Sequence, residues 1–132
     1  MARPQSEHPT ELELEILKIL WEESPLLVRD IRAQLADQAN RQLTHSSVVT
    51  MLNIMHRKGY VRRRKQGKSF LFTPKENRTR VTGRMVKDML SKLFDGSPTA
   101  LMLNLLESTD VDAEEFAELR ALIARKAKEK KS

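Results

Sequence analysis

The sequence of 132 residues contains no cysteine. This absence excludes a disulfide framework, a thiolate nucleophile and every zinc, copper or iron–sulfur site built on cysteine. The four glycines are isolated from one another, so the sequence has no glycine-rich loop for a nucleotide phosphate. His8, His45 and His56 are too far apart along the chain to predict a shared metal site. We therefore expect no metal ion and no organic cofactor.

Long apolar runs are missing as well. No apolar stretch approaches the ~20 residues that span a bilayer, and residues 1–10 lack a basic region followed by an apolar one. The sequence therefore predicts a cytoplasmic protein without membrane contact. Its length suits one compact domain or two small ones, and it leaves little room for a deep catalytic cleft.

Acidic residues are scarce in the middle of the chain. The whole sequence has 24 Lys and Arg against 18 Asp and Glu, a formal net charge of +6. Residues 41–80 carry eleven of the basic side chains and a single acidic one, Glu76. A basic run alone is most often a solvated surface, but this one coincides with the structural motif described next. The basic block therefore favours a polyanionic partner.

Hydrophobic periodicity predicts three helices in the first half of the chain, at about 11–23, 28–36 and 44–58. Thr10 followed by Glu13 is a capping box that opens the first helix. Thr44 is a good N-cap for the third helix, and Gly59 suits the left-handed position that closes it. After Gly59 the pattern changes from helical to strand-like.

Residues 60–73 have the pattern of a two-stranded hairpin with a basic tip around Gly67. Phe70 and Phe72 alternate along the second strand, so both are expected on its buried face. Three helices followed by a basic hairpin is the order of a winged helix–turn–helix module, whose third helix enters the DNA major groove. We therefore predict a mostly α-helical protein with a small β-hairpin, and we assign residues 10–74 to a winged-helix DNA-binding domain.

The third helix carries a polar outer row opposite its apolar face. The members of this row that can reach base edges are Ser46, Thr50 and Asn53. An Asn side chain can pair bidentately with adenine. A second set is expected to contact the DNA backbone and fix the register: Thr44, His45, Ser47, Arg57, Arg62, Arg63, Arg64, Lys65 and Lys68.

Residues 75–125 are predicted to be helical and rich in apolar side chains. Ser97-Pro98 is a helix start, and the helix expected at 98–107 is apolar on nearly every side, so a short C-terminal part cannot cover it alone. We predict a dimerisation domain that uses Val81, Met85, Met89, Leu90, Leu93, Leu101, Leu105, Phe116, Leu119 and Leu122. Residues 1–9 and the basic tail 126–132 are expected to be disordered.

Three stretches carry a resemblance to a known family. They are LELEILKILWEESPLLVRDIRAQL at 12–35, LTHSSVVTMLNIMHRKGYVRRRKQGKSFLFTP at 43–74 and LFDGSPTALMLNLLE at 93–107. The chain resembles the penicillinase-repressor family of winged-helix transcription factors, the BlaI/MecI/CopY type, over about residues 10–125. The resemblance implies a homodimeric repressor bound to an inverted-repeat DNA operator. It also implies that residues 44–58 are the recognition helix and residues 60–73 the wing.

The chain departs from the family pattern at several positions. Leu27 stands where members usually have a Thr or similar cap, which predicts a less firmly started second helix, and Val49 replaces a basic or long polar residue. Copper-responsive members carry a C-terminal cysteine cluster, so copper sensing by that route is excluded. In members that serve β-lactam resistance, a sensor protease inactivates the repressor by cleavage after an Asn, and the matching bond here joins Asn104 to Leu105.

Three other classes compete with a sequence-specific repressor. A nuclease needs clustered carboxylates, and the basic block offers only Glu76, so we expect no enzyme. A non-specific DNA- or RNA-binding protein needs no base-reading helix, and an RNA module would expose aromatic side chains for stacking. A protein-interaction adaptor would use the apolar C-terminal helices and leave the basic block incidental.

Overall fold

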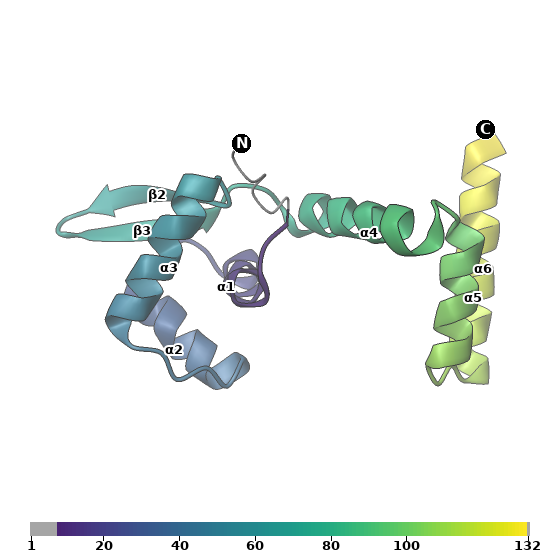
Figure 1. Cartoon of the computed structure of the whole chain (residues 1–132), viewed down its shortest axis with the longest axis horizontal. Helices are drawn as coiled ribbons and strands as arrows, with labels where there is room; N and C mark the ends of the chain where they lie inside the picture. Colours follow the sequence, from purple (N-terminus) through teal and green to yellow (C-terminus); the bar gives the residue numbers. More distant parts are fainter. Residues whose placement is uncertain (1–7, 132) are drawn as a thin grey trace. The chain divides into compact units, whose positions relative to one another are not determined.

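The computed structural model describes residues 8–131 and divides into two compact units, with the boundary between Val86 and Lys87. The N-terminal unit contains α1 (Glu11–Glu22), β1 (Leu26–Leu27), α2 (Val28–Gln38), α3 (His45–Lys58), β2 (Val61–Gln66), β3 (Ser69–Pro74) and the first half of α4 (Arg78–Phe94) (Figure 1). The C-terminal unit contains the end of α4, α5 (Pro98–Ser108) and α6 (Ala113–Lys131).

The helix ends of the N-terminal unit follow the predicted capping signals. The Thr10 N–H donates to Glu13 Oε1 at 2.8 Å, and the Glu13 N–H donates to Thr10 Oγ1 at 3.3 Å, which completes the capping box of α1. Thr44 caps α3 by accepting the Ser47 N–H at 3.1 Å. Gly59 closes α3 with φ +84°, the left-handed conformation that favours glycine.

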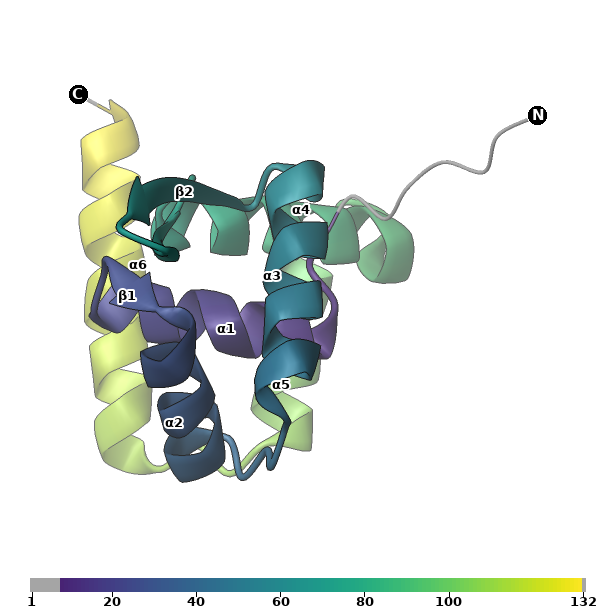
Figure 2. The same cartoon turned by 90° about the vertical axis from the view of Figure 1, so that its left-hand side faces the viewer.

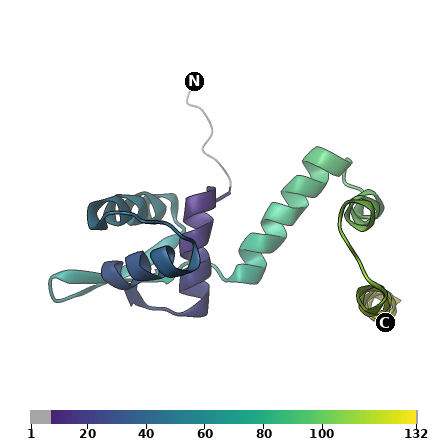
Figure 3. The ribbon, with the colours of Figure 1, turned by 90° about the horizontal axis from the view of Figure 1, so that it is seen from below.

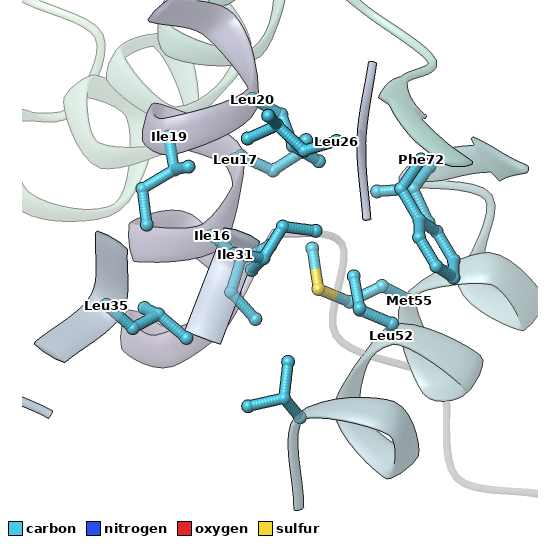
Figure 4. Packing of buried hydrophobic residues seen from close by; sticks show 12 residues of the cluster. Ile16, Leu17, Ile19, Leu20, Leu26, Ile31, Leu35, Leu52, Met55 and Phe72 are labelled. Atoms are coloured by element: carbon cyan, nitrogen blue, oxygen red, sulfur yellow. The ribbon is translucent and has the colours of Figure 1, made fainter. Parts of the chain in front are cut away.

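One hydrophobic core holds α1, α2, α3 and the sheet together (Figure 4). Each helix buries one apolar stripe in it, and the fully buried side chains include Ile16, Ile31, Leu35, Val48 and Leu52. Phe72, on β3, closes the core from the side of the sheet. This packing fixes the orientation of α3, whose opposite face is turned to solvent.

The sheet has three antiparallel strands in the order β1-β3-β2. Leu26 lies opposite Phe72 in the β1–β3 pair, and Val61 lies opposite Pro74 at the base of the β2–β3 hairpin. The hairpin, with its turn at Gly67, extends away from α1, α2 and α3 (Figures 1 and 3), and in Figure 2 it points toward the viewer. The element order and this sheet are those of a winged helix, as predicted.

Two details of the N-terminal unit differ from the sequence prediction. Strand β1 is not predicted, because two residues are too short to show the alternation by which a strand is recognised. Phe70 is 36% exposed, although the alternation predicts that it is buried beside Phe72, which is 2% exposed. Phe70 is nearer the hairpin turn than Phe72 and lies at the edge of the core, so its ring is only partly covered.

Both helices of the C-terminal unit begin at a capping residue, and the start of α5 is the predicted one. Ser97 caps α5 by accepting the Ala100 N–H at 3.1 Å, and Pro98 occupies the first turn. Asp112 accepts the Glu115 N–H at 2.9 Å at the start of α6. Every side chain of α5 and α6 that the structure describes remains at least partly exposed within the single chain.

The prediction of disordered tails is wrong where the structure describes them. Helix α6 continues to Lys131, because Lys126 and Glu129 form an i,i+3 ion pair at 3.4 Å and lysines favour the negative end of a helix dipole. Pro9 is buried. Residues 1–7 and 132 lie outside the described residues. Between residues 8 and 131, every helix is too short or too polar to cross a bilayer.

Candidate nucleic-acid interface

The outward face of α3 carries the three predicted base-reading residues. Ser46, Thr50 and Asn53 are all exposed, while Val48 and Leu52 on the opposite face are fully buried in the core. The core therefore holds α3 rigidly and presents the polar row to solvent. This geometry is what a helix inserted into a major groove requires.

The first turn of α3 gathers three hydroxyl groups. The Thr44 hydroxyl, which caps the helix, donates to Ser47 Oγ at 2.8 Å and lies 3.3 Å from Ser46 Oγ. His45 is exposed beside them. At the other end of the helix, Arg57 is exposed in the last turn. Both ends of α3 thus carry predicted backbone-contacting residues.

The wing, formed by β2 and β3, carries the remaining predicted backbone-contacting residues. These side chains are exposed along β2 and the turn: Arg62, Arg63, Arg64, Lys65 and Lys68. Successive side chains of a strand point to opposite faces, so Arg63 is turned the other way from Arg62 and Arg64. Each face of the wing therefore presents positive charge.

Arg63 differs from the other wing arginines because it contacts α3. Its Nη1 donates to Asn53 Oδ1 at 3.0 Å, and its guanidinium carbon lies 4.7 Å from the centroid of the Phe70 ring. A hydrogen bond and a cation–π contact therefore connect the wing to the recognition face. No periodic pattern in the sequence signals this long-range contact.

A pocket of about 370 Å³ lies between α3, the start of α2 and the wing. Val49, Phe70 and Phe72 contribute to its apolar floor. Its basic lining residues are Arg29, His45, Arg63 and Lys68, and among the described residues no acidic side chain lines it. The concave part of the predicted interface is thus both cationic and apolar.

An ion pair that sequence reasoning missed joins the first turn of α1 to the last turn of α3. Lys58, in the last turn of α3, donates to Glu13 Oε2 at 3.0 Å and to Oε1 at 3.2 Å. Glu13 is 1% exposed. Burial raises the pKa of the neighbouring Tyr60 hydroxyl, and the negative charge of Glu13 raises it further.

Glu76 organises a second ionic cluster at the start of α4. Its carboxylate accepts from Arg84 at 2.8 and 2.9 Å and from Arg80 at 3.3 Å. The hydrogen bond from Arg84 lowers the pKa of Glu76, and the same bond raises the pKa of Arg84. The Trp21 indole N–H donates to the Glu76 carbonyl at 2.9 Å, which connects this cluster to α1.

This cluster changes the interpretation of the basic block. Arg80 and Arg84 are paired with Glu76, and Arg78 is paired with Glu22 at 3.3 Å. Two carboxylates therefore offset two of these three positive charges within the chain, whereas the wing arginines have no carboxylate partner among the ion pairs of the described residues. The positive potential of the N-terminal unit therefore concentrates on α3 and the wing.

The predicted dimerisation residues fall into three groups by exposure. Val81 is only 4% exposed in the single chain, so its assignment to a subunit interface is wrong: the N-terminal unit already covers it. Half-buried members are Met85, Leu90, Leu101 and Leu119. Exposed members are Met89, Leu93, Leu105, Phe116 and Leu122.

Two apolar pockets lie between α5 and α6, of about 400 and 350 Å³. Both are lined by Met102, Leu106 and Leu119.

The predicted cleavage bond between Asn104 and Leu105 lies inside α5, and the Asn104 carbonyl accepts from Ser108 Oγ at 2.6 Å. Within residues 8–131, no cluster of three His, Asp or Glu side chains is arranged to hold a metal ion.

The sequence of this chain is similar to those of known proteins over most of its length. The chain is 24% identical to the penicillinase repressor of Bacillus licheniformis over 122 residues, which are 92% of this chain and 94% of that protein. It is also 24% identical to the methicillin resistance regulatory protein MecI of Mammaliicoccus sciuri, over 86% of this chain and 91% of the relative.

Among solved structures, H. salinarum RosR matches with a TM-score of 0.50 at 16% identity, and the match covers 93% of this chain and 97% of that one. This likeness concerns the fold alone. The sequence of residues 9–125 matches the family described as penicillinase repressor. Because that match spans most of the chain, the protein belongs to the penicillinase repressor family.

Proposed function

We propose that this chain is a DNA-binding transcriptional repressor that recognises an inverted-repeat operator as a homodimer. The observation that carries the proposal is the exposed polar row of α3 beside a basic wing, held in place by a fully buried core. In this arrangement α3 reads bases, while the wing and the ends of α3 neutralise phosphates. Its relatives include a penicillinase repressor and a methicillin resistance regulatory protein, which supports the same role.

The homodimer accounts for the exposed apolar residues of the C-terminal unit. Leu105, Phe116 and Leu122 are each more than 40% exposed in the single chain. A second copy would cover them without another partner. A two-fold symmetric dimer would bind two half-sites about one helical turn of DNA, or a multiple of it, apart.

Repression ends when the repressor leaves DNA, and we propose a proteolytic route of the β-lactam-resistance type at Asn104-Leu105. A sensor protease would be the partner. Because the bond lies inside α5, the helix must first unfold locally, which would separate residues that support the dimer. Incubation with the purified protease should give one cut at this bond, and Asn104→Ala should stop it. Cleavage elsewhere, or equal cleavage of the variant, would contradict this route.

The function is tested by selecting bound fragments from genomic DNA and sequencing them. We expect enrichment of an inverted repeat, and an isolated half-site should bind much more weakly than the full site. Equal affinity for all sequences would instead favour a non-specific nucleic-acid-binding protein. If the chain binds no DNA at all and its C-terminal helices capture another protein, a protein-interaction adaptor would be favoured.

A further inference from the structure

We infer that Arg63 is a positioning residue that presents Asn53 to DNA as a hydrogen-bond donor, and that it thereby takes part in base selection. This inference rests on the proposed function. From the sequence alone, Arg63 is one of several equivalent phosphate-binding residues. The structure distinguishes it from Arg62 and Arg64, because only Arg63 among these three has a hydrogen bond to the recognition helix in the described residues.

The chemistry of the contact fixes the orientation of the Asn53 amide. A guanidinium group has hydrogen-bond donors only, so the atom of Asn53 that faces Arg63 Nη1 at 3.0 Å must be the amide oxygen. The amide nitrogen of Asn53 then points away from Arg63. Each amide N–H remains available to a ligand, while one lone pair of the oxygen is occupied.

Phe70 holds the Arg63 side chain in place. The guanidinium lies 4.7 Å from the ring centroid, and Arg63 is paired in register with Phe72, two residues from Phe70 on the same face of β3. The Phe70 ring, which is 36% exposed and lies outside the core, has this contact on its surface. Phe70 therefore supports a side chain of the interface.

The orientation determines which bases Asn53 can recognise. Bidentate pairing with adenine uses the amide oxygen to accept from N6 and the amide nitrogen to donate to N7. With one lone pair of its oxygen held by Arg63, Asn53 presents mainly its amide nitrogen as a donor, which matches the acceptors of guanine or the O4 atom of thymine. Adenine is disfavoured because its N6 donor must share the Asn53 oxygen with the Arg63 guanidinium. The preferred partner of Asn53 is therefore guanine or thymine.

The test compares base preferences of variants by selection from a library in which each half-site position is randomised. Arg63→Ala should alter preference at the base pair that Asn53→Ala also alters, and should raise the relative affinity for adenine there about tenfold. Arg64→Ala is the matched control, because it removes the same charge from the adjacent position on the other face of β2. It should lower affinity for all sequences without changing the preference.

A second measurement needs no DNA. In the free protein, the NMR signal of the Asn53 side-chain NH₂ should shift in Arg63→Ala and in Phe70→Ala, and should remain unchanged in Arg64→Ala.

In the DNA selection, Arg63→Lys, which keeps a donor but not the planar group, should restore part of the base preference that Arg63→Ala loses. Thermal unfolding monitored by circular dichroism identifies any variant that fails to fold.

The outcomes separate the two hypotheses. If the wild type selects an operator but Arg63→Ala and Arg64→Ala have the same effect, or if the wild type selects adenine at the Asn53 position, the inference is wrong and the proposed function stands. If the wild type shows no sequence preference at all, the proposed function fails, and the role of Arg63 in base selection fails with it.

Discussion

Glu13 shows how one side chain can support two helices, α1 and α3. Its carboxylate completes the capping box of α1 and accepts from Lys58 at the end of α3. The side chain is 1% exposed, so its charge is stabilised by these partners and not by water. A carboxylate from the first turn of α1 therefore adds to the core packing that orients the proposed recognition helix.

Replacing Glu13 with Ala should lower the free energy of unfolding by about 2–3 kcal/mol. A broken buried ion pair is costly, but Lys58 is 24% exposed and can turn toward water, which keeps the loss below that of a fully buried pair. Urea unfolding measures the change. Glu11→Ala, at an 86% exposed side chain in the same turn, is the control and should cost less than about 0.5 kcal/mol. Equal losses for both variants would contradict this role.

Glu76 should make part of the stability depend on pH. Its folded pKa lies below the ordinary value of 4.5, because Arg84 donates hydrogen bonds to the carboxylate. A lowered pKa contributes stability that is present above 4.5 and is lost as the pH falls through the folded value. The contribution should be at most about 1 kcal/mol, because both side chains are partly exposed.

Glu76→Gln should therefore reduce the free energy of unfolding at neutral pH and flatten its fall as the pH drops below 4.5. Urea unfolding at a series of pH values provides the measurement. Asp37→Asn, at an exposed position of α2, is the control and should preserve the slope of the wild type. If Glu76→Gln also keeps the wild-type slope in acid, the cluster does not stabilise the fold.

At the scale of elements, local signals predicted the helices well. Capping residues and periodicity act within one or two turns, so Thr10, Thr44 and Ser97 could be identified as helix starts. Contacts between distant residues have no such local signature. The Glu13–Lys58 pair and the Arg63–Asn53 hydrogen bond depend on tertiary packing, and the sequence predicted neither.

The lack of a local signature for tertiary contacts also explains two errors of the sequence prediction, the burial of Phe70 and the interface role of Val81. Exposure of Phe70 depends on how far the hairpin extends past the core, and burial of Val81 depends on where α4 meets the rest of the N-terminal unit. Both residues lie on the apolar face that periodicity predicts for their strand or helix. Periodicity identifies a face of an element but not its partner.

Two glycine substitutions should have opposite effects on stability. Gly59 ends α3 with φ +84°, so Gly59→Ala should cost about 1–2 kcal/mol. Gly83 lies inside α4, and an added Cβ would meet open space, so Gly83→Ala should stabilise the protein by up to about 1 kcal/mol. Thermal unfolding of both variants tests the pair. A stabilised Gly59→Ala would mean that α3 ends in a different conformation.

At the scale of the whole molecule, the exposed charge of the wing should determine the salt dependence of DNA binding. Arg62→Ala and Arg64→Ala should weaken operator and random DNA by similar factors. Each should reduce the magnitude of the log-log salt slope by about 1 for every phosphate that is no longer neutralised, or about 2 for a dimer. Asn53→Ala should instead cost about 1–3 kcal/mol on the operator only. Titrations at several salt concentrations measure both effects, and uniform weakening by Asn53→Ala would reverse the assignment.

The exposed apolar side chains of α5 and α6 lead to the last prediction, which concerns association of two chains. Phe116 is 43% exposed and lines the larger apolar pocket between these helices, where a second subunit would cover it. Sedimentation should show a dimer at micromolar concentration. Phe116→Lys should shift the protein toward monomers, because a buried aromatic anchor is worth about 2 kcal/mol or more in each subunit.

The matched control is Glu114→Lys, an exposed polar change in the first turn of α6. It should leave the sedimentation profile unchanged. Because folding and association are coupled in many dimers, the unfolding temperature of the wild type should also rise with protein concentration, and that of Phe116→Lys should not. Full-site DNA affinity should fall in Phe116→Lys, since one tethered pair of recognition helices becomes two independent binders. A wild-type monomer whose unfolding temperature is independent of concentration would contradict the dimer and the inverted-repeat operator together.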